Sequence, residues 1–270
     1  MRYGLIAGNG RFPILALETA RKLGLEVVVV AIREEAAPEV EQLAARCYWV
    51  SLGQLGRLIE ILRQEQITEV MMAGQVKHAR IFSGIQPDWK LFKVLAALPA
   101  KNTDSLIGAV ARVLEEEGIR LADSTLLLKP LLASRGAMTK RKPGRDERAD
   151  VEYGRRVAKA LAGFDIGQSV VISDRACIAV EAMEGTDATL RRAATLANGR
   201  PLRLVKVSQR RGHLLFDVPV AGPGTIEVMR ETGATMLAVD AGRTLLLDRE
   251  EMLAAANEAG LCLFGYEPDD

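Results

Sequence analysis

The sequence has few aromatic residues, few histidines and almost no net charge. Aromatic residues make up 4% of the 270 residues, and the formal net charge is +1 at pH 7. Nucleic-acid-binding proteins usually combine a basic surface with stacking aromatics, so this composition argues against a nucleic-acid partner. The only histidines are His78 and His213. Such a low number argues against a zinc site of the usual kind.

Cysteine pairs and long apolar runs are also missing. Cys47, Cys177 and Cys262 lie far apart and form no Cys-x-x-Cys motif. We interpret them as small buried side chains in a reducing compartment. No apolar run reaches the ~20 residues that a membrane span needs, and the patch after Arg2 is too short for a secretory signal. We therefore expect a cytoplasmic protein.

What is present fits an α/β protein of two domains. Hydrophobic residues make up 49% and charged residues 26%, which is ordinary for a globular protein. In residues 1–133, the strand-like runs "YGLIAG", "EVVVVAI", "RCYWVSL" and "TEVMMAG" alternate with helical patterns. This alternation predicts a Rossmann-like parallel sheet with helices on both faces, which would serve as a nucleotide-binding domain.

The second half has a different rhythm. Residues 134–150 are dense in charge, and we interpret them as a linker. Residues 151–270 form the expected C-terminal catalytic α/β domain with a mixed sheet. There "QSVVIS" and "ACIAVEA" predict one hairpin, and "TMLAVDA" and "RTLLLD" predict a second around Gly242. We expect the last helix to begin with a capping box of Asp248 and Glu251.

The loop "GNGRFP" joins the first expected strand to the first expected helix. Gly8 and Gly10 would let a ligand approach the backbone, and the free amides of a helix start favour an anion such as a diphosphate. The third glycine of the dinucleotide fingerprint is missing, so NAD specificity is not indicated. Glu34 and Glu35 follow the second strand, where a ribose-binding carboxylate would lie. The alternative is a tight turn with solvated glutamates.

Two other segments of the N-terminal half could contact a ligand. "AGQVKHARIF" leaves the fourth strand at its carboxyl end, and there Lys77 or Arg80 could meet a phosphate. We interpret His78 as a hydrogen-bonding surface residue rather than a catalyst. "DWKLFKVLAALP" places Trp89 and Phe92 near one helix face. This pattern fits core packing, but it also fits contact with an acyl chain or the membrane surface.

The stretch "EAMEGTDATLRR" gathers acids where a strand passes into a helix. Glu181 belongs to the strand, whereas Glu184 and Asp187 lie at the junction. A helix cap with solvated acids explains this pattern, but several oxygen donors at one junction also suit Mg²⁺. Arg191 and Arg192 could hold phosphate oxygens or line a solvated helix face.

A second acidic position lies in "KVSQRRGHLLFDVPVAGPGTIE", where Asp217 interrupts an apolar segment. A carboxylate in apolar surroundings needs a partner that offsets its desolvation. A metal ion is one such partner, and turn amides are the alternative.

Four stretches together resemble the LpxI-type UDP-2,3-diacylglucosamine pyrophosphatases of lipid A biosynthesis. They are "GNGRFP", "AGQVK", "DIGQSVVI" with "AVEAMEGTD", and "FDVPVAGPGTIE". The resemblance covers essentially the whole chain. It implies an enzyme that hydrolyses the diphosphate of UDP-2,3-diacylglucosamine to UMP and 2,3-diacylglucosamine 1-phosphate (lipid X), with Mg²⁺ or Mn²⁺ as cofactor.

The resemblance also suggests site residues. It carries the family's essential aspartate onto Asp217 and matches Glu184 and Asp187 as further catalytic acids. The resemblance leaves the metal ligands open, and we expect Asp187 and Asp217 to be the ligands because carboxylates suit Mg²⁺. The expected substrate-binding residues are Gly8, Asn9, Gly10, Gln75, Lys77, Gln168, Thr186, Arg191, Lys206 and Thr225. Family members often carry a run like "KPxQDxRxD" before the aspartate, and no role for its first acid carries over to "KVSQRRGHLLFD".

Two other functions stay open on the sequence alone. An NAD(P)-linked oxidoreductase would need a complete glycine fingerprint and a positioned proton donor. A non-catalytic nucleotide-sugar-binding module would bind UDP without metal-dependent turnover. The sequence also leaves open a homodimer and peripheral contact with the inner membrane.

Overall fold

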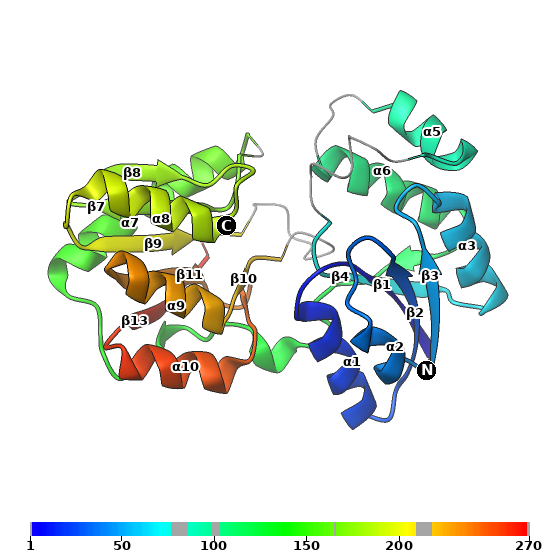
Figure 1. Cartoon of the computed structure of the whole chain (residues 1–270), viewed down its shortest axis with the longest axis horizontal. Coiled ribbons are helices and arrows are strands. Elements are labelled where there is room, and N and C mark those ends of the chain that lie inside the picture. Colours follow the sequence, from blue (N-terminus) through cyan, green and yellow to red (C-terminus); the bar gives the residue numbers. More distant parts are fainter. Residues whose placement is uncertain (1, 77–85, 99–102, 165, 209–217, 269–270) are drawn as a thin grey trace. The chain divides into compact units, whose positions relative to one another are not determined.

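A computed structural model describes residues 2–76, 86–98, 103–164, 166–208 and 218–268. The chain divides into two compact units, Met1–Leu128 and Lys129–Asp270 (Figure 1). The first unit holds a parallel sheet and the second a mixed sheet, each covered by helices. The expected α/β class with these two kinds of sheet is therefore confirmed.

The first unit is a parallel sheet of order β3-β2-β1-β4-β5. Its strands are β1 (Arg2–Ala7), β2 (Glu26–Ile32), β3 (Arg46–Val50), β4 (Glu69–Ala73) and β5 (Arg120–Leu121). Its helices are α1 (Phe12–Lys22), α2 (Glu39–Leu43), α3 (Leu55–Gln64), α5 (Trp89–Ala96) and α6 (Thr103–Glu116). The strand order reverses between β1 and β4, the kind of switch point where open α/β sheets bind ligands.

The second unit is built around a six-stranded sheet of order β6-β13-β11-β9-β7-β8. Its strands are β6 (Gly136–Ala137), β7 (Ser169–Ser173), β8 (Ala176–Val180), β9 (Leu202–Lys206), β11 (Ala234–Asp240) and β13 (Cys262–Tyr266). A separate pair joins β10 (Val220–Ala221) to β12 (Leu245–Leu246). The helices are η1 (Lys129–Leu131), α7 (Arg145–Ala162), α8 (Thr186–Ala197), α9 (Pro223–Thr232) and α10 (Arg249–Glu258).

Both faces of the six-stranded sheet are covered. The helix α7 packs its buried Val151 and Ala158 on one face, while α8, α9 and α10 cover the other (Figure 1). The backbone of α7 comes very close to the sheet at Gly154. A Cβ atom there would lie 2.7 Å from a side-chain carbon of Ile172 and 2.8 Å from one of Val205. Glycine is required at this position because the helix touches the sheet.

One of the two expected hairpins forms. β7 and β8 are antiparallel, and Asp174 and Arg175 make the turn with φ of 51° and 58°. Positive φ at both turn positions matches the right-handed twist of the two strands. The second expected hairpin was wrong, because β11 is parallel to both β9 and β13, while β12 pairs with β10. An apolar run in the sequence indicates a buried strand, but it does not indicate which strand pairs with it.

The expected capping box of the last helix was also wrong. Asp248 is the N-cap of α10, but its φ is 44° and its side chain makes no cap hydrogen bond. A capping side chain reaches the helix amides from an extended backbone, and the left-handed conformation of Asp248 points it elsewhere.

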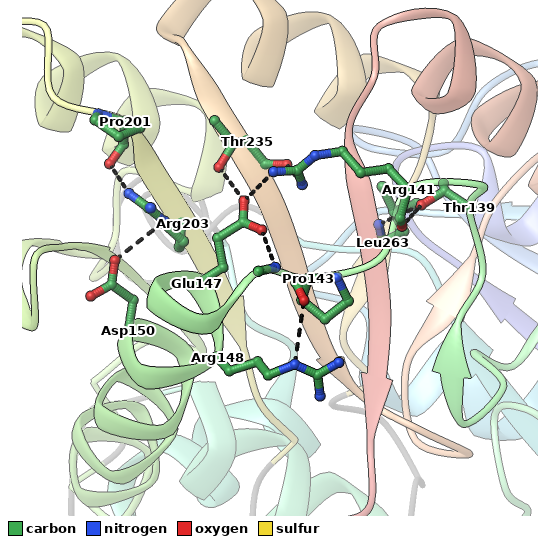
Figure 2. Close-up of polar contacts among 11 residues, drawn as sticks. Thr139, Arg141, Pro143, Glu147, Arg148, Asp150, Pro201, Arg203, Thr235 and Leu263 are labelled. Atoms are coloured by element: carbon green, nitrogen blue, oxygen red, sulfur yellow. Dashed lines mark hydrogen bonds and ion pairs between the residues drawn. The ribbon is translucent and has the colours of Figure 1, made fainter.

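The charged segment 134–150 is part of the second unit rather than a separate linker. β6 pairs antiparallel with β13, and α7 begins at Arg145. Three of its charged side chains, Arg141, Glu147 and Asp150, contact strand residues, as Figure 2 shows. Dense charge indicated a linker because the sequence does not show which of these charges pair with residues of the strands.

Glu147 is the centre of these contacts and is only 4% exposed. Its Oε1 accepts hydrogen bonds from Arg141 Nη2 at 2.7 Å and from Thr235 Oγ1 at 2.7 Å. Its Oε2 accepts the Gly144 amide at 2.9 Å (Figure 2). Burial alone would raise the pKa of Glu147, but these hydrogen bonds outweigh burial and lower the pKa below its ordinary value. The carboxylate ties the start of α7 to β11.

The states of the cysteines and the lengths of the helices can be compared with what the composition predicted. The three cysteines are free; Cys262 is buried, while Cys47 and Cys177 are half-buried. Burial raises the pKa of Cys47 and of Cys262 to about 11, so both stay protonated near neutral pH. Within the described residues, no helix has both the length and the apolar character that crossing a bilayer requires.

The Glu147 contacts generate a stability prediction. Glu147→Gln removes the charge and places an amide NH₂ opposite one of the two donors, Arg141 or the Gly144 amide, so the free energy of unfolding at pH 7 should fall by about 2–3 kcal/mol. Because the folded pKa lies below the ordinary 4.5, the wild-type contribution is present above pH 4.5 and is lost as the pH falls through the folded pKa. Urea unfolding across a pH series that runs from neutral pH to well below the ordinary pKa of 4.5 measures both effects.

The control is Glu152→Gln, an exposed position of the same helix. Equal stability losses in the two variants, or an unchanged acid dependence in Glu147→Gln, would contradict the role given to Glu147.

Candidate functional site

The candidate site lies at the edge of the second sheet where its parallel strands end. β9 ends at Lys206 and β11 at Asp240, while the antiparallel β7 begins at Ser169 opposite Lys206. β8 runs parallel to β9, so α8, which follows β8, begins at this same edge. Open α/β sheets place their ligands outside the carboxyl ends of the strands.

Three side chains from different elements form a hydrogen-bonded chain at this edge. Lys206 Nζ donates to Thr186 Oγ1 at 2.9 Å, and Thr186 Oγ1 donates to Glu181 Oε1 at 3.0 Å. Ser169 Oγ lies 3.5 Å from the same threonine oxygen. The Thr186 hydroxyl therefore accepts from an ammonium group and donates to a carboxylate, which fixes its orientation.

Both charged ends of this chain are incompletely satisfied. Lys206 is only 7% exposed, and among the described residues its ammonium has a hydroxyl as partner but no carboxylate within ion-pair distance. Glu181 Oε2 is a buried atom with no hydrogen-bond partner in the described part of the chain. Buried charges are normally paired because desolvation is costly. The arrangement suits a ligand that brings an anion to Lys206 and a cation or a donor to Glu181.

The start of α8 adds positive potential beside these groups. Gly185 is the N-cap with φ of 83°, and no side chain caps the helix. Thr186 is directed to Lys206 and Glu181 instead, and Asp187 is exposed in the first turn. The uncapped amides of a helix start and the positive end of its dipole favour an anion. The interpretation of Thr186 or Asp187 as a plain cap was therefore wrong.

Glu184 and the two following arginines are already paired. Glu184 accepts the Ala182 amide at 3.0 Å and Arg192 Nη2 at 2.6 Å. Hydrogen bonds from its own backbone amide and from Arg192 lower the pKa of Glu184 to about 2. Arg191 makes an exposed ion pair of 3.0 Å with Glu231. These contacts hold the turn before α8 and use the carboxylate of Glu184 and the guanidinium of Arg191 within the protein.

Gln168 and Thr225, two more of the expected residues, lie at the same edge. The Gln168 carbonyl accepts the Val207 amide at 2.9 Å, which places Gln168 beside the end of β9. Thr225 Oγ1 accepts the Gly222 amide at 3.4 Å at the start of α9. Since α9 connects β9 to the parallel β11, its first turn also lies at the carboxyl ends.

The sequence reasoning missed two acids, the partly buried Glu181 and the buried Asp240. Glu181 was interpreted only as a strand residue. Its place at the end of one strand and the place of Lys206 at the end of the next strand in the sequence could have indicated that the two side chains lie at the same sheet edge. Asp240 is 1% exposed, and its Oδ2 accepts the Ser208 amide at 2.9 Å and the Ser208 hydroxyl at 3.1 Å. Arg155 Nη2 lies 3.4 Å from Asp240 Oδ1. This acid fastens the chain just beyond β9 to the end of β11.

In the first unit, the structure brings four of the expected residues together at the switch point. Asn9 and Gln75 exchange backbone hydrogen bonds of 2.8 and 3.1 Å between the loops after β1 and β4. A Cβ atom on Gly8 would lie 2.7 Å from the Gln75 carbonyl oxygen, so this glycine serves loop packing. Gly10 has φ of 95° with open space around it, and Asn9, Gly10 and Gln75 are exposed.

The remaining expectations for this unit have mixed outcomes. Glu34 Oε2 accepts the Leu52 amide at 3.1 Å, and Glu35 is buried rather than solvated. Lys77, His78 and Arg80 lie outside the described residues.

Asp217 also lies outside the described residues, and so does any metal site that includes it. Within the described ranges, no group of three or more acidic, histidine or cysteine side chains is arranged to hold a metal ion. Of the described acids, Asp187 lies in the first turn of α8 and Glu181 accepts a hydrogen bond from Thr186.

Comparison with solved structures adds little. The biotin carboxylase domain of 2-oxoglutarate carboxylase from Hydrogenobacter thermophilus shares 11% identity at a TM-score of 0.29, covering 75% of this chain and 43% of that one. The purK N5-carboxyaminoimidazole ribonucleotide synthetase shares 14% identity at a TM-score of 0.29, covering 63% and 31%. The chain thus spans less than half of each, and likeness at this level supports no conclusion.

Comparison of sequences is far more specific. The UDP-2,3-diacylglucosamine pyrophosphatase LpxI of Caulobacter vibrioides is 32% identical over 279 residues, covering 100% of this chain and 99% of the relative. The model of the LpxI N-terminal domain matches residues 2–131, and that of the LpxI C-terminal domain matches residues 134–264. With both domain models and a full-length relative in agreement, the chain belongs to the LpxI family.

Proposed function

We propose that this protein hydrolyses the diphosphate of UDP-2,3-diacylglucosamine to UMP and 2,3-diacylglucosamine 1-phosphate, with Mg²⁺ or Mn²⁺. The relative of the same length is named for action on this substrate. The observation that carries the proposal is the buried Lys206 ammonium, which has only a hydroxyl as its described partner beside an uncapped helix start. That environment suits an anion as compact and highly charged as a diphosphate.

Lys206 and the start of α8 bind and neutralise the phosphate oxygens. A diphosphate repels an incoming nucleophile, so its hydrolysis depends on positioning and charge stabilisation. The burial of Lys206 strengthens its attraction for phosphate because the local dielectric constant is low. Thr186 accepts a hydrogen bond from one N–H of the ammonium group, which leaves the other two N–H groups to be directed at the substrate.

Mg²⁺ prefers carboxylate oxygens as protein ligands. The ion usually binds to one or two carboxylates together with water and substrate phosphate. The unpaired Glu181 Oε2 and the exposed Asp187 carboxylate fit that chemistry, and the family resemblance adds Asp217. These residues would hold the ion, which when bound would supply charge neutralisation and a more acidic water. Glu184 contributes less directly, because Arg192 already occupies its carboxylate.

The first unit takes the nucleotide in this proposal. Its switch-point loops expose Asn9, Gly10 and Gln75, and Arg11 at the N-cap of α1 makes no side-chain cap. The amides at this helix start are therefore available to an anionic or polar ligand. The exposed surface around Gly10 leaves room for the ligand to approach the backbone.

The role of Asp217 is tested by Asp217→Asn. This variant should keep the fold and bind substrate, but it should release UMP at less than about a hundredth of the wild-type rate, because a neutral amide is a poor metal ligand and base. Product formation is followed by mass spectrometry and folding by circular dichroism. Asp174→Asn, at the exposed hairpin turn, is the matched control and should be fully active. Near-normal turnover in Asp217→Asn would remove Asp217 from the mechanism.

Lys206→Met separates a catalytic role from a structural one. Methionine keeps the length and loses the charge, so kcat/KM should fall by about 10²–10³. The melting temperature should stay equal or rise, because an incompletely paired buried charge has been removed. The exposed Lys22→Met is the control. A variant that loses stability but keeps its activity would show that Lys206 supports only the fold.

Hydrolysis in ¹⁸O water, with Mg²⁺ and with a chelator, tests the reaction itself. We expect metal-dependent incorporation of one ¹⁸O atom into either UMP or the sugar phosphate, and the labelled product identifies the attacked phosphorus. Binding of UDP without any product in either condition would instead identify a non-catalytic nucleotide-sugar-binding module.

A further inference from the structure

The helix α5 of the first unit presents two large aromatic side chains to solvent. Trp89 is 68% exposed and Phe92 is 51% exposed. Their rings are stacked, with centroids 5.7 Å apart and planes 13° apart. Large aromatics are normally buried because their transfer from water is favourable, so such a pair on a helix surface indicates a binding face.

This exposure is a fixed feature of the fold. The opposite face of α5 buries Leu91 and Val94 against the unit. At the helix start, Asp88 accepts the Leu91 amide at 2.9 Å and the Gly56 amide of α3 at 2.6 Å. The helix is therefore held against α3 by both apolar packing and its cap (Figure 1). The core-packing interpretation of the two aromatics was wrong.

The charge on α5 is entirely positive. Its two lysines are Lys90 and Lys93, and it contains no acidic residue. Lys93 Nζ lies 5.1 Å from the centroid of the Trp89 ring, while Lys90 is ion-paired with Glu117. The exposed surface thus combines aromatic rings with a cation, and the carboxylate of the capping Asp88 is already used by backbone amides.

We propose that Trp89, Phe92 and Lys93, the aromatic–lysine face, dock on the surface of an anionic lipid bilayer. Tryptophan is enriched at the headgroup level because its ring is amphipathic, and lysine is attracted to anionic lipids. An amphipathic helix with aromatics on one side and lysines nearby binds in the plane of the interface. This inference goes beyond the proposed function, which concerns the diphosphate site of the other unit.

The size of the face favours a bilayer over a second copy of the chain. A fully buried aromatic ring contributes about 150–250 Å², so two rings that are partly covered offer roughly 300 Å². A stable protein interface needs about 800 Å² from each partner. A bilayer needs no such area, because a few inserted side chains together with charge attraction give reversible binding.

The two tryptophans of the chain allow a direct readout of insertion. Trp49 lies on β3 and donates to Glu41, so Trp49→Phe leaves Trp89 as the only indole. Vesicles of equimolar phosphatidylcholine and phosphatidylglycerol should shift the fluorescence of this full-length variant to the blue. Brominated lipids should quench it. An unchanged spectrum at saturating lipid would overturn the proposal.

A pair of double variants tests the energetics by vesicle co-sedimentation. Trp89→Ser with Phe92→Ser should weaken binding at least about tenfold, because two apolar groups no longer leave water. Leu23→Ser with Leu196→Ser, which removes exposed apolar side chains elsewhere, should bind as wild type. Lys93→Glu should weaken binding to the anionic vesicles but not to pure phosphatidylcholine. The exposed Lys22→Glu is its control.

Two results would contradict the proposal. Equal vesicle binding by the Trp89/Phe92 double variant and its control would show that another surface carries the contact. A change in sedimentation coefficient of the lipid-free protein on the Trp89/Phe92 substitution would identify a second copy as the partner. The vesicles contain no substrate, so failure here leaves the proposed hydrolysis untouched, and failure of the hydrolysis leaves this inference untouched.

Discussion

The site depends on one buried positive charge that no carboxylate among the described residues neutralises. Lys206 ends β9 inside the second unit, and the partner that the structure gives it is the Thr186 hydroxyl. Because desolvating an ammonium group is costly, the proposed function assigns the missing negative charge to the diphosphate of the substrate. The buried Oε2 of Glu181 also has no hydrogen-bond partner among the described residues, and no side chain caps the amides at the start of α8.

The two ends of β9 differ in how their charges are satisfied. Near its first residues, Arg203 lies 3.2 Å from Asp150, and the Asp150 carboxylate also accepts the Arg175 amide at 2.6 Å. Figure 2 shows this pair beside the fully hydrogen-bonded Glu147. The amino ends of the parallel strands thus carry contacts that hold the fold. At the carboxyl ends, Asp240 is bonded within the protein, whereas Lys206 and Glu181 keep hydrogen-bonding capacity that the described residues do not use. Open α/β sheets bind their ligands at this edge.

Local patterns in the sequence predicted most of the elements but not their partners. The β-branched run that became β2 and the alternation in β7 and β8 indicated strands, because periodicity follows burial. The pairing of β12 with β10 depends on contacts distant in sequence, which no local pattern contains. The same limit applied at the site. The family resemblance matched Glu184 as one of the catalytic acids, but Arg192 binds it, whereas Glu181, which was not chosen, accepts a hydrogen bond from Thr186.

Lys206 and Thr186 were both expected substrate-binding residues, and the structure joins them by a hydrogen bond of 2.9 Å. Both lie where a strand ends or a helix begins, which is where side chains can meet a ligand. Their role in binding substrate stays a prediction. The most direct test of the account is a crystal structure of the protein with its sugar-phosphate product bound. The account predicts a phosphate oxygen within about 3 Å of Lys206 Nζ. A phosphate bound elsewhere, with the Lys206 ammonium still hydrogen-bonded only within the protein, would contradict it.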